Sequence, residues 1–102
     1  MWISAMFDLP VLTACDRKNY REVRNMLISS GFVNVQKSLF WRWVENKEFA
    51  EALIHRVQKK LPCSGDIIFL YIPDTAFKES IHIVNGAKQK TPDPPPPWLI
   101  LT

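Results

Sequence analysis

The chain has 102 residues, 47% of them hydrophobic, and a formal net charge of +3 at pH 7. A chain of this length forms one domain that buries about 65% of the surface its unfolded form exposes, and its composition argues against disorder. No apolar run approaches the ~20 residues of a membrane span, and no basic segment precedes the first apolar strand as in a signal peptide. These features predict a cytoplasmic globular domain that has no membrane partner.

The excess positive charge lies in the first half of the chain. Residues 1–44 contain six basic and three acidic side chains, whereas residues 45–102 contain seven of each. This asymmetry indicates a face that binds a polyanion, and a solvated helix face is the alternative. The two cysteines, Cys15 and Cys63, belong to no CxxC or Cys/His cluster, which predicts reduced thiols and no zinc site.

The first eight residues predict a buried strand that ends in a single carboxylate. The segment "WISAMFDLP" is apolar up to Asp8, and Pro10 prevents the strand from continuing within a sheet. One carboxylate alone holds a metal ion poorly. Asp8 is therefore either a residue that caps a loop or one half of a site whose other half comes from elsewhere.

Residues 16–30 have the apolar spacing of a helix, with Tyr20, Val23 and Leu27 on one stripe and Gly31 at its end. Thr13 or Asp16 can cap its start. Three arginines recur at i, i+4 and i+7 beside the apolar stripe, namely Arg17, Arg21 and Arg24. This spacing predicts a basic edge along the helix.

The block "FVNVQKSLFWRWV", residues 32–44, is rich in β-branched and aromatic residues and predicts one long or two short strands. Its alternation places Leu39, Trp41 and Trp43 on one face, and Phe40, Arg42 and Val44 on the other.

A second helix is expected after Asn46, which would cap it, and Pro62 ends it. Its apolar stripe consists of Ala50, Leu53, Ile54, Val57 and Leu61. The apolar run "IIFLYI" then predicts a central strand, "DTAFKES" a helical turn and "IHIV" a weaker strand. This order predicts an α+β, ferredoxin-like βαββαβ sandwich, in which two amphipathic helices cover one face of an antiparallel sheet.

The end of the chain favours an association between subunits. "KTPDPPPP" predicts a stiff polyproline arm, and each apolar side chain of "WLILT" left in water would forfeit about 1.5–3 kcal/mol. We therefore expect a ferredoxin-like domain over 1–86, a proline-rich linker over 87–97 and a strand over 98–102. That strand would pair with a sheet edge of a partner subunit, and packing on its own domain is the alternative. The expected interface residues are Trp98, Leu99, Ile100 and Leu101.

Taken in order, "MFDLP", "RKNYREVR", "GFVNVQKSLFWR", "LPCSGDIIFLYIPD" and the apolar C-terminal segment resemble the CRISPR-associated protein 2 family, the small subunit of the CRISPR adaptation module. Two departures are "SLF", where Val is more usual after the Ser, and the proline-rich tail. The resemblance implies a ferredoxin-like fold, a symmetric homodimer and a C-terminal strand that crosses to the partner's sheet.

The resemblance also implies a role for Asp8, because the signature acid of the family ends the first strand. The two copies of Asp8 would face each other across the dimer axis and supply the missing half of the site. Two carboxylates about 5 Å apart repel by roughly 3 kcal/mol at an effective dielectric constant of 20. A divalent cation such as Mg²⁺ would remove this repulsion and could activate water to attack a phosphodiester.

The partners that the resemblance implies are the CRISPR-associated integrase, whose dimers this subunit would bridge, and prespacer duplex DNA. Sequence-independent phosphate contacts suit such a role, and the candidate residues are Arg17, Lys18, Arg21, Arg24, Lys37 and Arg42. Two alternatives stay open. One is a stand-alone metal-dependent endoribonuclease related to virulence-associated toxins. The other is a module that binds single-stranded RNA and stacks bases on Trp41 and Trp43.

Overall fold

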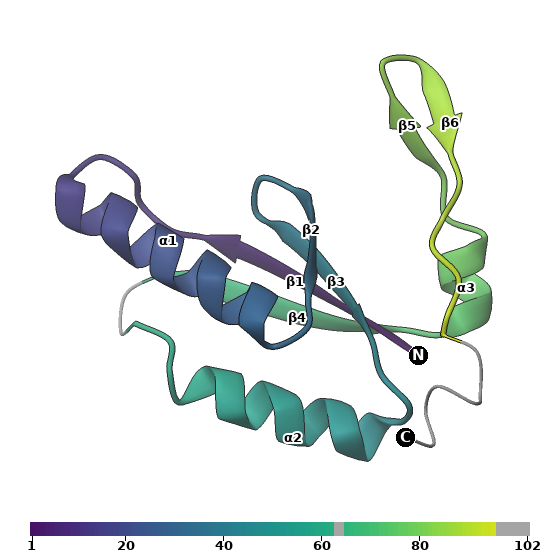
Figure 1. Cartoon of the computed structure of the whole chain (residues 1–102), viewed down its shortest axis with the longest axis horizontal. Helices are drawn as coiled ribbons and strands as arrows, with labels where there is room; N and C mark the ends of the chain where they lie inside the picture. Colours follow the sequence, from purple (N-terminus) through teal and green to yellow (C-terminus); the bar gives the residue numbers. More distant parts are fainter. Residues whose placement is uncertain (63–64, 96–102) are drawn as a thin grey trace.

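The computed structural model describes residues 1–62 and 65–95, which form a four-stranded antiparallel sheet, two long helices and a separate two-stranded hairpin (Figure 1). In chain order the elements are β1 (Trp2–Asp8), α1 (Ala14–Ser29), β2 (Val33–Gln36), β3 (Leu39–Trp43), α2 (Lys47–Gln58), β4 (Asp66–Ile72), α3 (Asp74–Lys78), β5 (His82–Val84) and β6 (Ala87–Gln89).

The sheet has the strand order β2-β3-β1-β4. β1 is antiparallel to both of its neighbours, β3 and β4, and β2 is antiparallel to β3. This is the arrangement of a ferredoxin-like α+β domain, so the predicted fold is confirmed. The segment 32–44, predicted to form one long strand or two short ones, forms two short strands, β2 and β3. β4 lies at one edge of the sheet and pairs with β1 alone among the strands described.

Alternation along β1 divides the sheet into two faces. Ile3, Ala5 and Phe7 are buried in the core, together with apolar residues of α1 and α2. On β3, Phe40 and Val44 are buried in the same core, as their predicted face requires. We call the opposite side the open face. Its members on β1, β3 and β4 are Trp2, Ser4, Met6, Asp8, Leu39, Trp41, Trp43, Asp66, Ile68, Leu70 and Ile72.

The first turn of α1 is closed by a reciprocal cap. The backbone N–H of Asp16 donates to Thr13 Oγ1 at 3.0 Å, and the backbone N–H of Thr13 donates to Asp16 Oδ2 at 3.1 Å. Thr13 is therefore the N-cap and Asp16 the third helical residue, so the helix starts at Ala14, two residues before the predicted start. The cap fixes where the basic edge begins.

The other end of α1 is closed by Gly31, as predicted. The N–H of Phe32 donates to the carbonyl of Leu27, and the N–H of Gly31 donates to the carbonyl of Ile28, which together form a Schellman motif. Gly31 has a φ of +89°, and a Cβ there would lie 2.7 Å from Arg42 Nε. The backbone conformation therefore favours glycine at this position, and a larger residue would also require the side chain of Arg42 to shift.

α2 begins where the sequence predicts and ends slightly earlier. Asn46 Oδ1 accepts from the N–H of Phe49 at 2.8 Å, which makes Asn46 the N-cap. The helix ends at Gln58 with Lys59 as its C-cap, so Lys60 lies beyond it. Among the residues that the structure describes, no helix is both long and apolar enough to cross a membrane.

The segment after β4 differs from the expected linker. Residues 87–89 form β6, which pairs with β5 through a tight turn at Asn85 and Gly86, where φ is +51° and +80°. Two positive φ angles and an Asn-Gly pair are the features of a type I′ hairpin turn, and this signal is present in the sequence. The hairpin projects away from the sheet (Figure 1). The predicted strand over 98–102 lies outside the described residues.

We expect Gly31→Ala to destabilise the domain by about 2 kcal/mol and Gly86→Ala by about 1 kcal/mol or less. Both positions have positive φ, but only a Cβ at Gly31 would meet a neighbouring side chain, that of Arg42. Urea unfolding of the two variants measures the difference, with Gly86→Ala as the control for backbone strain alone. Equal losses would mean that Arg42 moves aside without cost.

Candidate functional site

Asp8 lies at the last position of β1, exposed on the open face. The register of the sheet places it directly opposite Asp66, the first residue of β4. Residues that are directly opposite in an antiparallel pair have Cβ atoms about 4.5–5.5 Å apart. One protomer therefore brings two carboxylates together at this end of the sheet. Sequence reasoning missed Asp66 because only the strand register, and no local pattern, connects it with Asp8.

A hollow of about 490 Å³ contains both carboxylates. Its wall also includes Lys37 and Ser38, which belong to the turn between β2 and β3. The Tyr20 hydroxyl donates to the carbonyl of Lys37 and lies 3.2 Å from Ser38 Oγ, so α1 holds this turn in place. The predicted nucleic-acid residue Lys37 thus lies beside Asp8, on the turn that α1 holds through Tyr20.

The donor set of this hollow suits a hard cation. Among the described residues no group of three or more His, Cys, Asp or Glu side chains could hold a metal ion. Asp8 and Asp66 provide two carboxylates per protomer, and Mg²⁺ is commonly held by one or two protein carboxylates with water completing its octahedron. The residues present therefore fit such an ion, and Asp8 and Asp66 are the side chains that would hold it. Cys15 is exposed on α1, and Cys63 lies outside the described residues.

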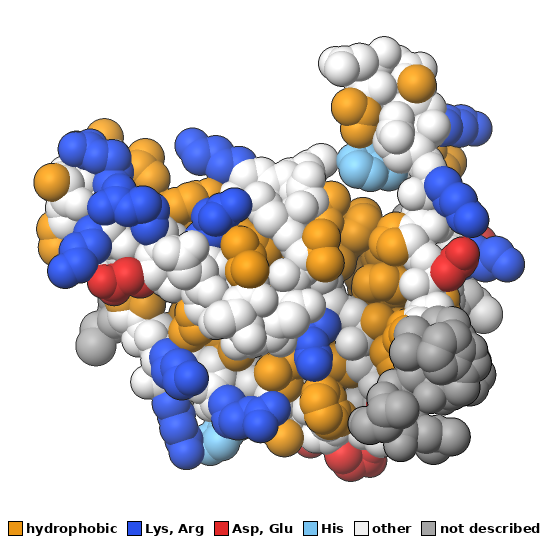
Figure 2. All heavy atoms as spheres, in the orientation of Figure 1, with side chains coloured by type: hydrophobic (Ala, Val, Ile, Leu, Met, Phe, Trp, Pro, Cys, Tyr) orange, Lys and Arg blue, Asp and Glu red, His pale blue; other side chains and the backbone are white. Residues whose placement is uncertain are grey.

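The predicted basic edge exists as one exposed row on α1. Arg17, Lys18, Arg21 and Arg24 are all exposed, and Figure 2 shows basic side chains gathered over this helix. Arg17 Nη1 donates to the carbonyl of Leu12 at 3.2 Å, which directs it towards the loop between β1 and α1. Within the described ranges, the ion pairs formed by side chains involve none of these four residues. Their charges are thus available to a ligand in solvent.

Arg42 lies apart from that row. Its place on β3 directs it to the helical face of the sheet, where its guanidinium carbon is 5.1 Å from the centre of the Phe49 ring. Burial, and secondarily the charge of Arg56, lower the pKa of Arg42. Among the described residues no acidic side chain forms an ion pair with Arg42, which instead meets an aromatic ring and lies near a second arginine.

The two tryptophans of β3 pack within the protein. The ring of Trp41 meets Phe77 of α3 edge-on at 4.8 Å between centroids, and Trp43 Nε1 donates to Asp74 Oδ1 at 3.2 Å. Phe77 also stacks on Trp2 at 4.3 Å. α3 therefore covers this end of the open face, and the arrangement favours packing over base stacking for these indoles.

Away from α3 and from its own two carboxylates, the open face presents exposed apolar residues, and the segment around β5 presents others. On β4, Ile68 and Leu70 are 53% and 47% exposed, and on the segment around β5, Ile81 and Ile83 are 70% and 57% exposed. Figure 2 shows hydrophobic side chains gathered between the sheet and the hairpin. Exposed apolar surface that is clustered in this way is typical of an interaction site.

The family profile described as CRISPR associated protein Cas2 matches residues 1–80 of the chain. A protein of Parvibaculum lavamentivorans named CRISPR-associated endoribonuclease Cas2 is 36% identical over 95 residues, which cover 93% of this chain and 94% of that protein. A protein of the same name from Ligilactobacillus salivarius is 36% identical over 90 residues, 88% of each chain.

The comparison of structures agrees with the fold. The crystal structure of Streptococcus pyogenes Cas2 at pH 6.5 matches with a TM-score of 0.56 and 24% sequence identity. The match covers 72% of this chain and 87% of that one. At this level of identity the match establishes the ferredoxin-like architecture and nothing finer.

Proposed function

The chain belongs to the Cas2 family of CRISPR-associated proteins, and on this premise we propose that it serves spacer acquisition as a homodimeric scaffold. The dimer bridges dimers of the integrase subunit and holds prespacer duplex DNA along its surface. The observation that carries the proposal is the exposed basic row on α1, whose charges have no acidic partner among the ion pairs of the described residues.

The geometry of the row suits a duplex backbone. From Arg17 to Arg24 the helix rises about 10 Å, the distance over which one DNA strand presents about three phosphates. The side chains recur at i, i+4 and i+7, so they project from successive turns of one helix edge. Contacts of this kind position a duplex and carry no sequence information, which is what a holder of varied prespacers requires.

The open face supports the homodimer. Its exposed apolar residues on β4 lie next to the outer edge of that strand, which pairs with no further strand among the described residues, and other apolar residues are exposed near β5. An uncovered edge next to apolar surface is a template for pairing with another chain. A second copy presents the same surface, so a two-fold dimer covers the apolar residues and the strand edge of both protomers at once.

We expect Leu70→Glu combined with Ile83→Glu to convert the dimer into a monomer, because both side chains are exposed apolar groups of the proposed interface. Sedimentation velocity measures the change, and circular dichroism verifies the fold. Ile28→Glu, an exposed apolar residue on the outer side of α1, is the matched control and should remain dimeric. A wild-type monomer, or a dimer that survives the double substitution, would contradict this interface.

The logarithm of the association constant for duplex DNA should fall linearly with the logarithm of the salt concentration. The slope should be about −0.9 for each phosphate that the protein neutralises. Arg21→Gln with Arg24→Gln removes four charges from a dimer, so the slope should fall by about two to four units. Lys47→Gln with Lys78→Gln makes the same change in net charge away from α1 and should keep the slope. Fluorescence anisotropy at several salt concentrations gives both values, and equal slopes for the two variants would remove α1 from the DNA-binding surface.

A second candidate function is metal-dependent phosphodiester cleavage, which the pairing of Asp8 with Asp66 favours. The relatives above are named endoribonucleases. In the dimer, Asp8 and Asp66 of both protomers would hold Mg²⁺, which when bound supplies Lewis acidity and a water of lowered pKa. Lys37, in the same hollow, is placed to bind the phosphate of a strand that approaches the carboxylates. RNA and DNA both present that phosphate.

Asp8→Asn should abolish any metal-dependent cleavage and leave the fold, the dimer and the integration of spacers with the partner integrase intact. The substitution removes a charge and preserves shape at an exposed position. Calorimetry with Mn²⁺ should show weaker binding for Asp8→Asn and for Asp66→Asn than for wild type. Loss of integration by an intact complex would assign Asp8 to the chemistry of acquisition and overturn the scaffold proposal. Full cleavage by Asp8→Asn would leave Asp8 only the role of capping a loop.

A further inference from the structure

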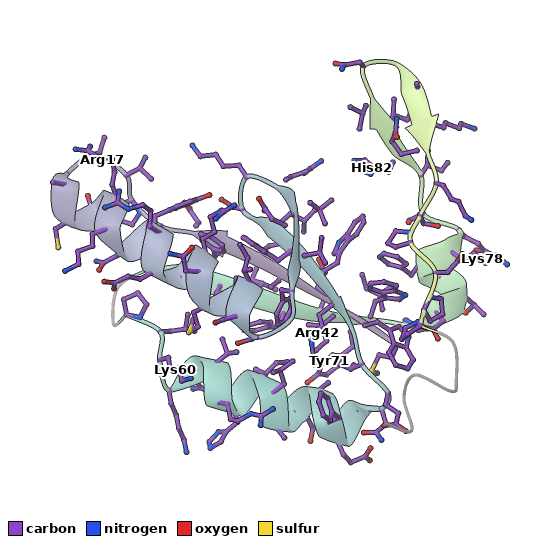
Figure 3. The ribbon with its side chains drawn as sticks, viewed as in Figure 1. Arg17, Arg42, Lys60, Tyr71, Lys78 and His82 are labelled. Atoms are coloured by element: carbon purple, nitrogen blue, oxygen red, sulfur yellow. The ribbon has the colours of Figure 1, made fainter. Side chains whose placement is uncertain are left out.

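A second hollow, of about 460 Å³, lies between the C-terminal end of α1, the second half of α2 and β3. Its wall carries three cationic side chains, Arg42, Arg56 and Lys60, and its described lining contains no carboxylate. Figure 3 shows Arg42 in the space between the two helices, with Lys60 past the end of α2. We call this hollow the Arg42 pocket. It is on the helical side of the sheet, opposite the open face.

Arg42 is incompletely bonded in this pocket. Its Nη1 is buried and has no hydrogen-bond partner among the residues that the structure describes. The Phe49 ring compensates part of the charge but offers no acceptor oxygen. A buried donor without an acceptor is costly, and more so when it carries a charge. Arg42 Nη1 therefore lacks a hydrogen-bond acceptor in its described surroundings.

The end of α1 does not supply this acceptor. The carbonyls of Met26, Leu27 and Ile28 in its last turn already accept from the N–H groups of Ser30, Phe32 and Gly31, and no acceptor of the described residues reaches Arg42 Nη1.

The neighbouring hydroxyl of Ser29 donates to the carbonyl of Met26 at 3.0 Å. Gly31 has no side chain to fill the space beside Arg42 Nε. The guanidinium consequently faces a space that a ligand can enter.

The two other cations add to the unfavourable charge. Arg56 and Lys60 are four residues apart, and Arg56 contributes to lowering the pKa of Arg42. Neither Arg56 nor Lys60 takes part in an ion pair within residues 1–62 and 65–95. Three like charges around one concavity repel each other, and an anion placed between them removes that repulsion.

We propose that the Arg42 pocket binds a phosphate-class oxyanion, held by the fork of Arg42 and by the charges of Arg56 and Lys60. A planar guanidinium matches two oxygens of a phosphate, and three positive charges favour such a multiply charged group over a carboxylate. The phosphate can be free, or it can belong to a nucleic-acid strand that passes over the end of α2. The site is separate from the basic row of α1 and from the hollow at Asp8, and it does not depend on the proposed function.

Titration of the full chain with inorganic phosphate, followed by ¹H–¹⁵N NMR, tests the site. We expect saturable shifts at the amides of Ser30 and Gly31 and at Arg42 Nε–H. Arg56→Gln with Lys60→Gln should weaken binding at least about tenfold, because charge-assisted hydrogen bonds are lost. Lys47→Gln with Lys78→Gln, equal in charge change, should leave the affinity within about twofold, since surface charges remote from a site act weakly. Absent shifts in the wild type, or equal weakening by both pairs, would overturn the proposal.

Arg42→Met provides an independent readout. An apolar side chain of similar length removes the unpartnered charge, so the melting temperature without phosphate should not fall, whereas the rise that phosphate produces in the wild type should disappear. A large loss of stability without phosphate would show that Arg42 serves the fold, and persistence of the phosphate effect would place the ion elsewhere. Either result would refute the site.

A parallel measurement of duplex DNA binding identifies the source of the phosphate. If the ligand is a nucleic-acid phosphate, the Arg56→Gln and Lys60→Gln pair also lowers the salt slope of duplex binding. If the ligand is free phosphate, that slope stays at the wild-type value while the NMR affinity falls. Both results support a phosphate pocket and assign its occupant.

Discussion

The register of β1 is the constraint on which the rest of the structure depends. β1 is paired on both sides, so its alternation sets which residues of β3 and β4 face the helices and which face away. Ile3, Ala5 and Phe7 go to the core, and a slip by one residue would exchange them with Ser4, Met6 and Asp8. The burial of three apolar side chains therefore fixes the position of the acid at the end of the strand.

This arrangement gives the protein three chemically different surfaces. The basic row of α1 is exposed to solvent, the open face is largely apolar with carboxylates at one end, and the Arg42 pocket is cationic and concave between the helices. A scaffold that must contact a second copy and a polyanion benefits from this separation, because the apolar surface can bind the second copy while the charged surface binds the polyanion. The hollow at Asp8 and Asp66 lies where the end of the open face meets the turn that Tyr20 holds, close to the start of α1.

Much of the fold was predictable from local patterns. The stripe of α1, the cap at Asn46 and the glycine at position 31 each act within a few residues, and the structure contains all three. What the sequence did not reveal depends on contacts between distant segments. Asp66 meets Asp8 only through strand pairing, and the environment of Arg42 requires two helices and a strand to be placed together. The strand β5 was expected from "IHIV", whereas its partner β6 lies at the start of the expected linker, because "AKQ" has none of the apolar alternation that predicts a strand.

The packing around α3 makes the intrinsic tryptophan fluorescence of the protein sensitive to the position of this helix. Three of its four tryptophans, Trp2, Trp41 and Trp43, contact residues of this short helix, Phe77 or Asp74. Trp41 also lies 6.1 Å, between ring centroids, from His82 at the base of the hairpin. Indole emission depends on the polarity of its surroundings, so the intrinsic fluorescence of this protein reports on whether α3 is seated on the sheet. Any partner that shifts the hairpin changes that signal without an added label.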